Sequence, residues 1–387
     1  ASAKLKFILF IDAILFLLCA AGLISIDQKA KLPFELTTQD SLISITIHDS
    51  NPYGLSTGDK LISVNSFKAN SIEKTEFITD MKNIGENILI SVKTKSGIKT
   101  LLVVLINYYS VFYFISTIIV ALLFFIIALF VLLKKQEMKA AHVFHWASIG
   151  LSVMLCLTWS NLNTLDFTSK SFLRTALHIS YALTPALFAH FSMIFPRDNT
   201  YKWRKLLQLN YLLALILSSV NIYVFVHTLY VISDASIDNY LAVFNYLRIY
   251  LIINVILSIG VFILAFLKEK AKVERQQLKW LLFGFIVGPL SFVVLWVLPI
   301  LFTGKALIAE ELVMILLCAI PITFAIAIIK YHLLDIDEVL NRSLVYGLVI
   351  LILIVLYSIA IGLFVSSFHI SDQSIVSAVA AILLALI

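Results

Sequence analysis

Long apolar runs separated by short polar stretches dominate this chain from one end to the other. A helix that crosses a membrane needs about 20 consecutive, mostly apolar residues. By this rule the sequence predicts about ten membrane-spanning helices, at residues 5–26, 109–133, 142–159, 172–195, 204–230, 240–267, 276–302, 311–330, 344–366 and 373–387. The last run reaches the final residue, so we expect the sequence to be a piece of a longer protein.

Residues 31–106 follow a different pattern. "SLISITIHDSNPYGLSTGDKLISVN" alternates apolar and polar residues between turn-forming residues, which predicts short strands joined by tight turns. "TEFITDMKNI" predicts a short amphipathic helix, and "NILISVKTKSGIKTLLVVL" predicts a hairpin that turns at Ser96 and Gly97. The predicted fold is therefore a mainly α, polytopic membrane protein with one small α+β domain between the first two spans.

The order of elements in this small domain resembles a PDZ domain. "GLSTGDKLISVN" is similar to the turn and strand that precede the short helix, with Gly54, Leu55, Gly58 and Asp59 in the turn. The resemblance implies binding of a peptide as an added strand at a sheet edge. The glycine-rich carboxylate loop of the family is replaced by "LPFELTTQDS", so a packing or dimerisation role stays an equal alternative.

Composition and charge agree with a membrane protein. The chain is 61% hydrophobic and only 13% charged, whereas soluble domains are about a quarter charged. The net charge of +6 comes from short joints between spans, not from a basic face with interleaved aromatic residues, so we expect no nucleic-acid partner. The joints on one side hold Lys134, Lys135, Lys139, Arg197, Lys202, Arg204, Lys205, Lys268, Lys270, Lys272, Arg275, Lys279, Lys330 and Arg342.

The opposite joints hold only Lys170, Arg174 and Lys305. Positive charge marks the cytoplasmic side, which predicts that both termini are cytoplasmic and that the PDZ-like domain is extracytoplasmic. Lys4 and Lys6 before an apolar run also fit a cleaved signal peptide, with "CAAG" as the cleavage region. The length of the run and its Asp12 favour an uncleaved anchor, and the alternative stays open.

Motifs for catalysis are absent from the sequence. An intramembrane metalloprotease with an outward PDZ domain needs H-E-x-x-H, which does not occur, and neither does the nucleophile motif G-x-S-x-G. Cys19, Cys156 and Cys318 each lie inside an apolar run and are expected to be buried hydrophobic residues, not metal ligands. We therefore predict no catalytic residue and no metal or cofactor site in these residues.

The segment "YHLLDIDEVLNRSLVYG" separates the last two predicted spans from the others. Asp335 followed three residues later by Glu338 is typical of a capping box that starts a helix. These carboxylates are therefore structural, in a cytoplasmic joint that follows a span carrying the kinking residue Pro321. The residues expected to transmit a signal here are Pro321, Asp335, Asp337, Glu338, Asn341 and Arg342.

This segment resembles the end of the membrane input region of bacterial sensor histidine kinases. "LTPALFAHFSMIFPR" and "VERQQLKWLLFGF" fit the same pattern, and the outward PDZ-like domain is most similar to the competence quorum-sensing kinases. The resemblance implies a multi-pass sensor in a bacterial cytoplasmic membrane that detects a peptide or lipidated peptide pheromone and forms a homodimer. It also implies a kinase domain beyond residue 387 that uses ATP and Mg²⁺ and phosphorylates a response regulator.

The organisation predicted on this basis has five parts: a transmembrane anchor (1–30), the PDZ-like domain (31–106), a sensor bundle (107–330), the capped joint (331–343) and the last two spans (344–387). A transporter remains an alternative, although no internal repeat supports one, as does an intramembrane protease-like protein. Candidate ligand residues are the ionisable and aromatic groups in the outer half of the spans: Trp159, Arg174, His178, Tyr246, Arg248, Tyr250, Trp296, Glu310 and Glu311.

Two ordinary explanations compete with a ligand site. Tryptophan and tyrosine near a membrane face usually form an interfacial belt. Arg248 would also be accounted for by a stabilising ion pair with Glu310 or Glu311. A cleft lined by aromatic residues, cations and an imidazole would instead suit an amphipathic ligand with an anionic end. Membrane lipid is a second expected partner, because it surrounds the spans.

Overall fold

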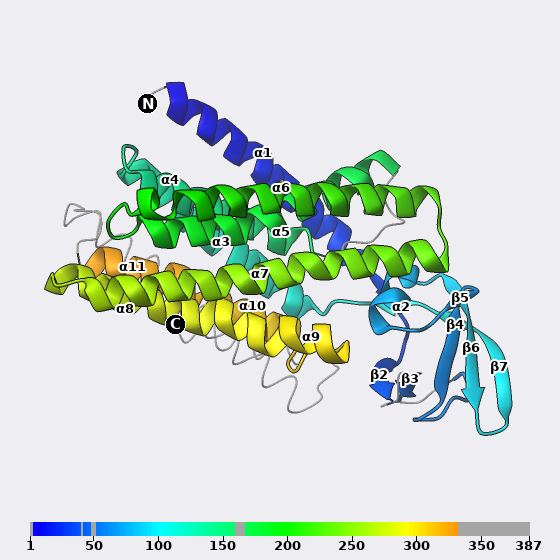
Figure 1. Ribbon diagram of the computed structural model, residues 1–387. Helices are drawn as coiled ribbons and strands as arrows, with labels where there is room; N and C mark the ends of the chain where they lie inside the picture. The colour runs from blue at the N-terminus through cyan, green and yellow to red at the C-terminus, as the bar shows by residue number, and fades with distance from the viewer. Residues whose placement is uncertain (1–2, 40–41, 48–51, 159–166, 332–387) are drawn as a thin grey trace, which may run out of the picture.

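A computed structural model describes residues 3–39, 42–47, 52–158 and 167–331 of the chain. It consists of a long helical bundle with a small β-sheet domain at one end (Figure 1). The predictions for the last two spans and for the signal joint from Asp335 to Arg342 lie outside the described residues, as does Trp159.

The bundle is built from long helices that follow the predicted spans closely. Six segments are long and apolar enough to cross a membrane, so the chain is a multi-pass membrane protein. They are α1 (Ala3–Asp27), α3 (Val111–Lys134), α5 (Phe167–Ile194), α6 (Thr200–Tyr230), α7 (Asp234–Lys268) and the segment Lys272–Thr303.

Two predicted spans are helical but do not meet that criterion. The span predicted at 142–159 corresponds to the 18-residue helix α4 (Lys139–Cys156), which packs between α3 and α5 and is mostly buried. The single span predicted at 311–330 is divided in the structure into two helices, α10 (Glu310–Leu317) and α11 (Ala319–Tyr331), which meet at Cys318. Ten spans are thus not established; among the described residues the structure supports six spans, with α4, α10 and α11 as three further helices of the bundle.

The segment Lys272–Thr303 is not a regular α-helix. It comprises α8 (Lys272–Phe285), two π-helical turns η1 (Ile286–Leu290) and η2 (Val293–Val297), and α9 (Leu298–Thr303). Pro289 in η1 lacks the amide proton that an α-helix needs, which gives a reason for the irregularity. Gly284 approaches α11 so closely that a Cβ at this position would lie 2.1 Å from the Thr323 hydroxyl oxygen.

The sheet domain contains the strands and the short helix that the alternating pattern predicts. Its antiparallel sheet has the strand order β2-β3-β4-β6-β7, with β5 beside β4. The strands are β2 (Glu35–Gln39), β3 (Leu42–Thr46), β4 (Lys60–Val64), β5 (Phe67–Lys68), β6 (Asn87–Thr94) and β7 (Gly97–Val104). Between β5 and β6 lies α2 (Ile72–Thr79).

The predicted turn before β4 is present. Gly58 has a φ of +97°, a conformation that L side chains rarely adopt, and its amide donates to Ile45 O. The Asp59 carboxylate accepts from the Ser56 amide at 2.8 Å and closes the turn. Leu55 is buried in the core of the sheet domain, and Gly54 also has a positive φ, of +64°.

The sheet domain is fixed to the bundle in two ways. A short antiparallel ladder between β1 (Ala30–Lys31) and β8 (Ile106–Asn107) joins the end of α1 to the start of α3. The hydrophobic core of the sheet domain also includes Phe225 from α6 and Tyr240 from α7. Because one core is shared, the sheet domain is held against the ends of α6 and α7 (Figure 1).

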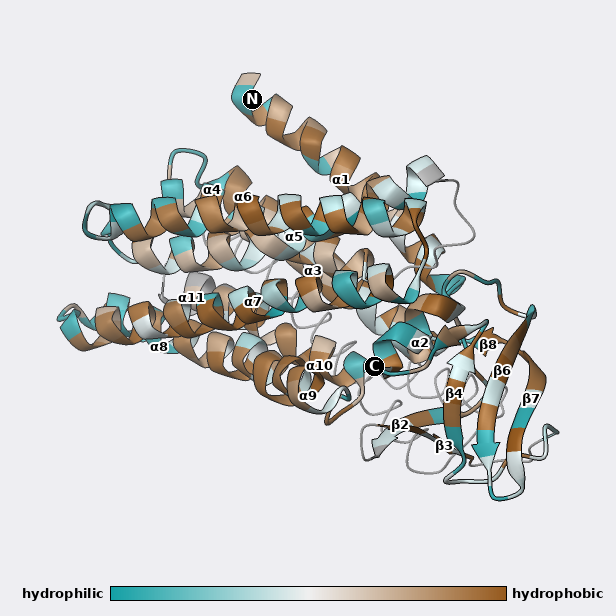
Figure 2. Ribbon diagram, turned by 45° about the vertical axis from the view of Figure 1, so that its right-hand side comes forward, coloured by the Kyte–Doolittle hydropathy of each residue, from teal (hydrophilic) through white to brown (hydrophobic). Residues whose placement is uncertain are grey.

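The surface of the bundle changes character along its length. Apolar residues cover the helices over most of their length, and hydrophilic residues collect at the two ends (Figure 2). The turns between α3 and α4, α5 and α6, and α7 and α8 carry the basic residues, and they lie at the end opposite the sheet domain (Figure 1). The predicted charge asymmetry is therefore an asymmetry between the two ends of the folded bundle.

Candidate functional site

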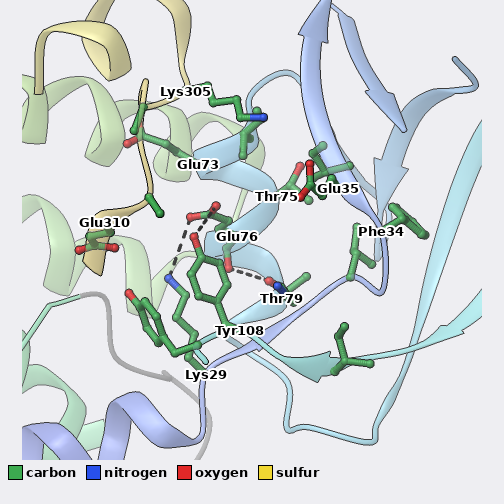
Figure 3. A pocket seen from close by; sticks show the side chains of 18 of the residues that line it. Lys29, Phe34, Glu35, Glu73, Thr75, Glu76, Thr79, Tyr108, Lys305 and Glu310 are labelled. Carbon is green, nitrogen blue, oxygen red and sulfur yellow. Dashed lines mark hydrogen bonds and ion pairs between the residues drawn. The ribbon is translucent and has the colours of Figure 1, made fainter. Parts of the chain in front are cut away.

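A large cavity lies where the sheet domain meets the bundle. It has a volume of about 900 Å³, and we call it the interdomain cavity. One wall is the segment from Lys29 through β2 together with α2, and the other is formed by Tyr108–Tyr113, Arg248, Trp296 and the loop that leads into α10 (Figure 3). Both parts of the molecule thus contribute to one site.

Helix α2 directs two carboxylates into this cavity. Ser71 caps the helix, its hydroxyl accepting from the Lys74 amide at 3.1 Å. Glu73 and Glu76 are three residues apart and hence lie on one face of the helix, and both line the cavity. The helix also packs against α7, where the rings of Phe77 and Tyr240 are 5.8 Å apart.

Arg248 of α7 is held by an ion pair with Glu73. Both guanidinium nitrogens donate to the carboxylate, Nη1 to Oε2 at 3.2 Å and Nη2 to Oε1. Nη1 also donates to Asn245 Oδ1 at 2.6 Å, and the guanidinium lies 5.1 Å from the centre of the Phe244 ring. Arg248 is 1% exposed, so its charge is stabilised almost entirely by these neighbours.

A second ion-pair group holds the other side of α2. Lys74 Nζ lies 2.6 Å from Asp234 Oδ1 and 3.0 Å from Asp238 Oδ2, both in the first turns of α7. The Asn70 amide group also donates to Asp238, at 3.3 Å. The lysine side chain is fully buried, whereas the two carboxylates are about 40% exposed. Helix α2 is therefore bound to α7 by charged contacts on two sides of the helix.

Lys29, just after α1, is buried between aromatic and acidic groups. Its Nζ lies 4.2 Å from the centre of the Tyr108 ring, 4.0 Å from Glu76 Oε2 and 3.7 Å from Asp80 Oδ2. The Tyr108 hydroxyl donates to Glu76 Oε1 at 2.9 Å (Figure 3). Burial raises the pKa of Asp80 to about 7 and also raises that of Glu76, although the Lys29 ammonium lowers both.

A row of tyrosines continues from this group to the start of α10. The rings of Tyr108 and Tyr109 meet edge to face at 4.6 Å, and those of Tyr109 and Tyr113 stack at 3.8 Å. The Tyr113 hydroxyl donates to Glu310 Oε1 at 3.5 Å. This row thus connects the carboxylates of α2 with Glu310 in the broken helix pair α10–α11.

Four of the predicted ligand residues line the interdomain cavity: Arg248, Trp296, Glu310 and Glu311. The ion pair predicted for Arg248 has a different partner in the structure: Arg248 pairs with Glu73, not with Glu310 or Glu311. The buried Lys29 and Arg248 side chains also lie against carboxylates of α2 and its C-terminal end that we did not predict at this site. Of the four cations that line the cavity, Lys29 and Arg248 lie against carboxylates, whereas Lys31 and Lys305 are exposed.

The other predicted ligand residues lie elsewhere. His178 is buried, with Nε2 3.1 Å from the Tyr240 hydroxyl, and the Arg174 guanidinium is 5.5 Å from the Phe225 ring centre. The Tyr250 hydroxyl donates to Asn210 inside the bundle. Tyr246 is 60% exposed on the outside of α7. None of the four is among the cavity-lining residues.

Several residues of the site were not predicted from the sequence: Lys29, Glu73, Lys74, Glu76, Asp80, Tyr108, Tyr109 and Tyr113. A signal for them exists in the Glu-Lys-x-Glu spacing of α2 and in the Tyr-Tyr pair that precedes α3. In the part of the chain that the structure describes, no group of three or more His, Cys, Asp or Glu side chains could hold a metal ion.

No family model matches the chain, and no curated protein is significantly similar to it. Function is therefore inferred from the site and from the sequence patterns alone.

Proposed function

We propose that this chain is the input region of a bacterial membrane sensor histidine kinase and that a peptide or lipidated peptide signal binds in the interdomain cavity. One observation carries the proposal: edge strand β2 and helix α2 line the same cavity as Trp296 and Glu310 of the bundle. A ligand there contacts both parts of the molecule at once. Its binding energy therefore favours one relative arrangement of the two parts over another.

The sheet domain is proposed to act as a PDZ-like module. The antiparallel sheet, the helix between β5 and β6, and the position of β2 at the edge of the described sheet support this proposal. A peptide would add along β2 and be covered by α2, with backbone hydrogen bonds supplying affinity and the cavity supplying side-chain pockets. The segment Leu32–Phe34 before β2 lacks the glycines of a carboxylate loop, so recognition of a terminal carboxylate is not part of the proposal.

The basic turns at the end opposite the sheet domain support a cytoplasmic location for that end. The protein would then lie in the bacterial cytoplasmic membrane with both termini inside and the interdomain cavity outside. The resemblance to sensor kinases further supports homodimerisation, an ATP- and Mg²⁺-dependent kinase domain after residue 387, and a response regulator as the cytoplasmic partner.

Transmission is proposed to run through α10 and α11. Glu310 at the start of α10 contacts the tyrosine row, and the two helices meet at Cys318, three residues before Pro321. A break in a helix permits its two halves to change their relative angle at low energetic cost. A signal that displaces α10 would reach the predicted joint at Asp335–Arg342 through α11.

A disulfide across the cavity tests this proposal. Thr38 in β2 and Gly304 in the loop after α9 face each other, and a Cβ at position 304 would lie 3.7 Å from Thr38 Oγ1. The variant Thr38→Cys/Gly304→Cys would be made in the full-length protein with its native cysteines replaced by alanine. Autophosphorylation of the reconstituted protein is expected to differ several-fold between the oxidised and the reduced form.

The two single-cysteine variants are the matched controls, because they carry the same substitutions, including the strain of a side chain at the positive φ of Gly304, without the cross-link. Equal autophosphorylation in the oxidised and reduced double variant, with the disulfide shown to be formed, would contradict the proposed role of the cavity.

A further inference from the structure

A second cavity lies at the other end of the bundle. It has a volume of about 580 Å³ and is bounded by the N-terminal turns of α1, α4 and α6 and the C-terminal turn of α5. We call it the basic cavity because its charged lining consists of Lys4, Lys139 and Arg204 against the single carboxylate of Asp198. His142 and His190 also line it.

The charges of the basic cavity are only partly neutralised. Lys139 Nζ lies 3.4 Å from Asp198 Oδ2, but the lysine side chain is 80% exposed and so contributes a weak ion pair. Neither Lys4 nor Arg204 has an ion-pair partner among the described residues. Three basic side chains and one carboxylate leave two positive charges. The cavity therefore favours an anion.

The position of the basic cavity relates it to the membrane. It lies where apolar helices begin and end, which is the level of lipid headgroups for a spanning helix. Further along the same helices, large apolar side chains are exposed: Phe7 and Phe10 of α1 are 64% and 63% exposed, and Leu209 and Leu212 of α6 are both 51% exposed. Figure 1 shows the N-terminal end of α1 standing away from the neighbouring helices. Hydrocarbon chains can thus lie against α1 and α6 below an anionic group in the cavity.

We propose that the basic cavity binds the headgroup of an anionic phospholipid. Lys4, Lys139 and Arg204 would contact the lipid phosphate, and the acyl chains would pack on the exposed apolar faces of α1 and α6. Basic pockets between spanning helices at a membrane face are suited to such lipids. Because α1 is one helix from Ala3 to Asp27, the lipid would hold the far end of the helix that leads to Lys29 in the interdomain cavity.

The test is native mass spectrometry of the purified protein in neutral detergent with added phosphatidylglycerol or phosphatidylcholine. We expect the wild type to retain phosphatidylglycerol preferentially. In the variant Lys4→Gln/Lys139→Gln/Arg204→Gln its affinity for that lipid should fall on the order of 100-fold, since each basic residue near an anionic lipid contributes about fivefold. Affinity for phosphatidylcholine should be unchanged.

The matched control removes three charges from the neighbouring basic turn, in the variant Lys268→Gln/Lys270→Gln/Lys272→Gln. It should bind phosphatidylglycerol as the wild type does, because the turn between α7 and α8 does not line the cavity. An equal loss in both variants would show a general attraction of the basic end and overturn the proposal. Equal binding of the two lipids by the wild type would also overturn it, as would displacement of the bound lipid by millimolar inorganic phosphate.

Discussion

The ion pair between Arg248 and Glu73 gives the sharpest prediction about the interdomain cavity. Substitution Glu73→Gln leaves the guanidinium of Arg248 buried without a carboxylate, beside the Asn245 amide oxygen and the Phe244 ring. Removal of one partner from a fully buried ion pair costs about 3–5 kcal/mol, and removal from an exposed pair costs at most about 1 kcal/mol. The Glu73 side chain is 23% exposed and that of Arg248 is 2% exposed. We therefore expect a loss of about 2–3 kcal/mol in the free energy that holds α2 on the bundle.

Hydrogen–deuterium exchange of the α2 amides measures this loss directly. A cost of about 2–3 kcal/mol corresponds to a roughly 30- to 150-fold faster exchange when α2 opens locally. The variant Arg248→Met should show an increase of similar size. The double variant Glu73→Gln/Arg248→Met should exchange less than about tenfold faster than the wild type, because neither unpaired charge remains buried.

Lys82→Gln is the matched control. Lys82 forms an ion pair with Glu86 at 3.3 Å in the same domain, but both side chains are more than a third exposed, so its loss should change α2 exchange less than about twofold. If the increases caused by Glu73→Gln and Arg248→Met multiply in the double variant, the two residues act independently. That outcome would refute the coupling of the sheet domain to α7 through this pair.

Three further predictions concern other parts of the molecule. The pKa of Asp80 is raised to about 7, so the folded protein should lose stability as pH rises from about 4 to 7, by at most roughly 4 kcal/mol; Asp80→Asn should flatten this dependence in thermal unfolding. Cys19 of α1 and Cys156 of α4 are buried neighbours where these two helices pack, so copper phenanthroline should cross-link them within one chain, and Cys19→Ala should abolish the product seen on peptide mapping. Gly284→Ala should lower the unfolding temperature by several degrees because the new methyl group meets α11, whereas Gly260→Ala, with open space around it, should leave it unchanged or raise it slightly.

Much of the fold could be predicted from apolar periodicity. The span predicted at 109–133 is α3 at 111–134. The hairpin predicted to turn at Ser96 and Gly97 is formed by β6 and β7, with its turn one residue earlier, at Lys95 and Ser96. Helix α2 begins earlier than predicted because Ser71 supplies an N-cap ahead of the amphipathic pattern. These elements depend on local sequence, which is why their positions could be read from it.

Irregular helices were harder to predict. Apolar runs of sufficient length indicated single continuous helices at 276–302 and 311–330, yet the first contains two π-helical turns and the second is divided at Cys318. Prolines at 289 and 321 mark the two places in the sequence. They do not specify whether a helix kinks, forms a π-turn or breaks, because packing against the neighbouring helix decides that.

The candidate site could be predicted only in part. Arg248 and Glu310 were candidates because an ionisable side chain in apolar surroundings has a high free-energy cost and is therefore often functional. The partner of Arg248 could not be found in this way, because Glu73 is 175 residues away and lies in a different domain. The roles of Arg174, His178 and Tyr250 as ligand contacts stay predictions, and the structure places these side chains in the bundle interior.

That the interdomain cavity opens to the outside of the cell is the claim on which the proposed signal site depends. Labelling of single cysteines with a membrane-impermeant maleimide in intact cells tests it most directly, with Ser96→Cys in the exposed β6–β7 turn and Lys270→Cys in the basic α7–α8 turn. The native cysteines are buried and should give little background. We predict labelling of Ser96→Cys in intact cells and labelling of Lys270→Cys only after permeabilisation. The reverse pattern would contradict the assignment of the sheet domain to the outside and, with it, the cavity as a receptor site.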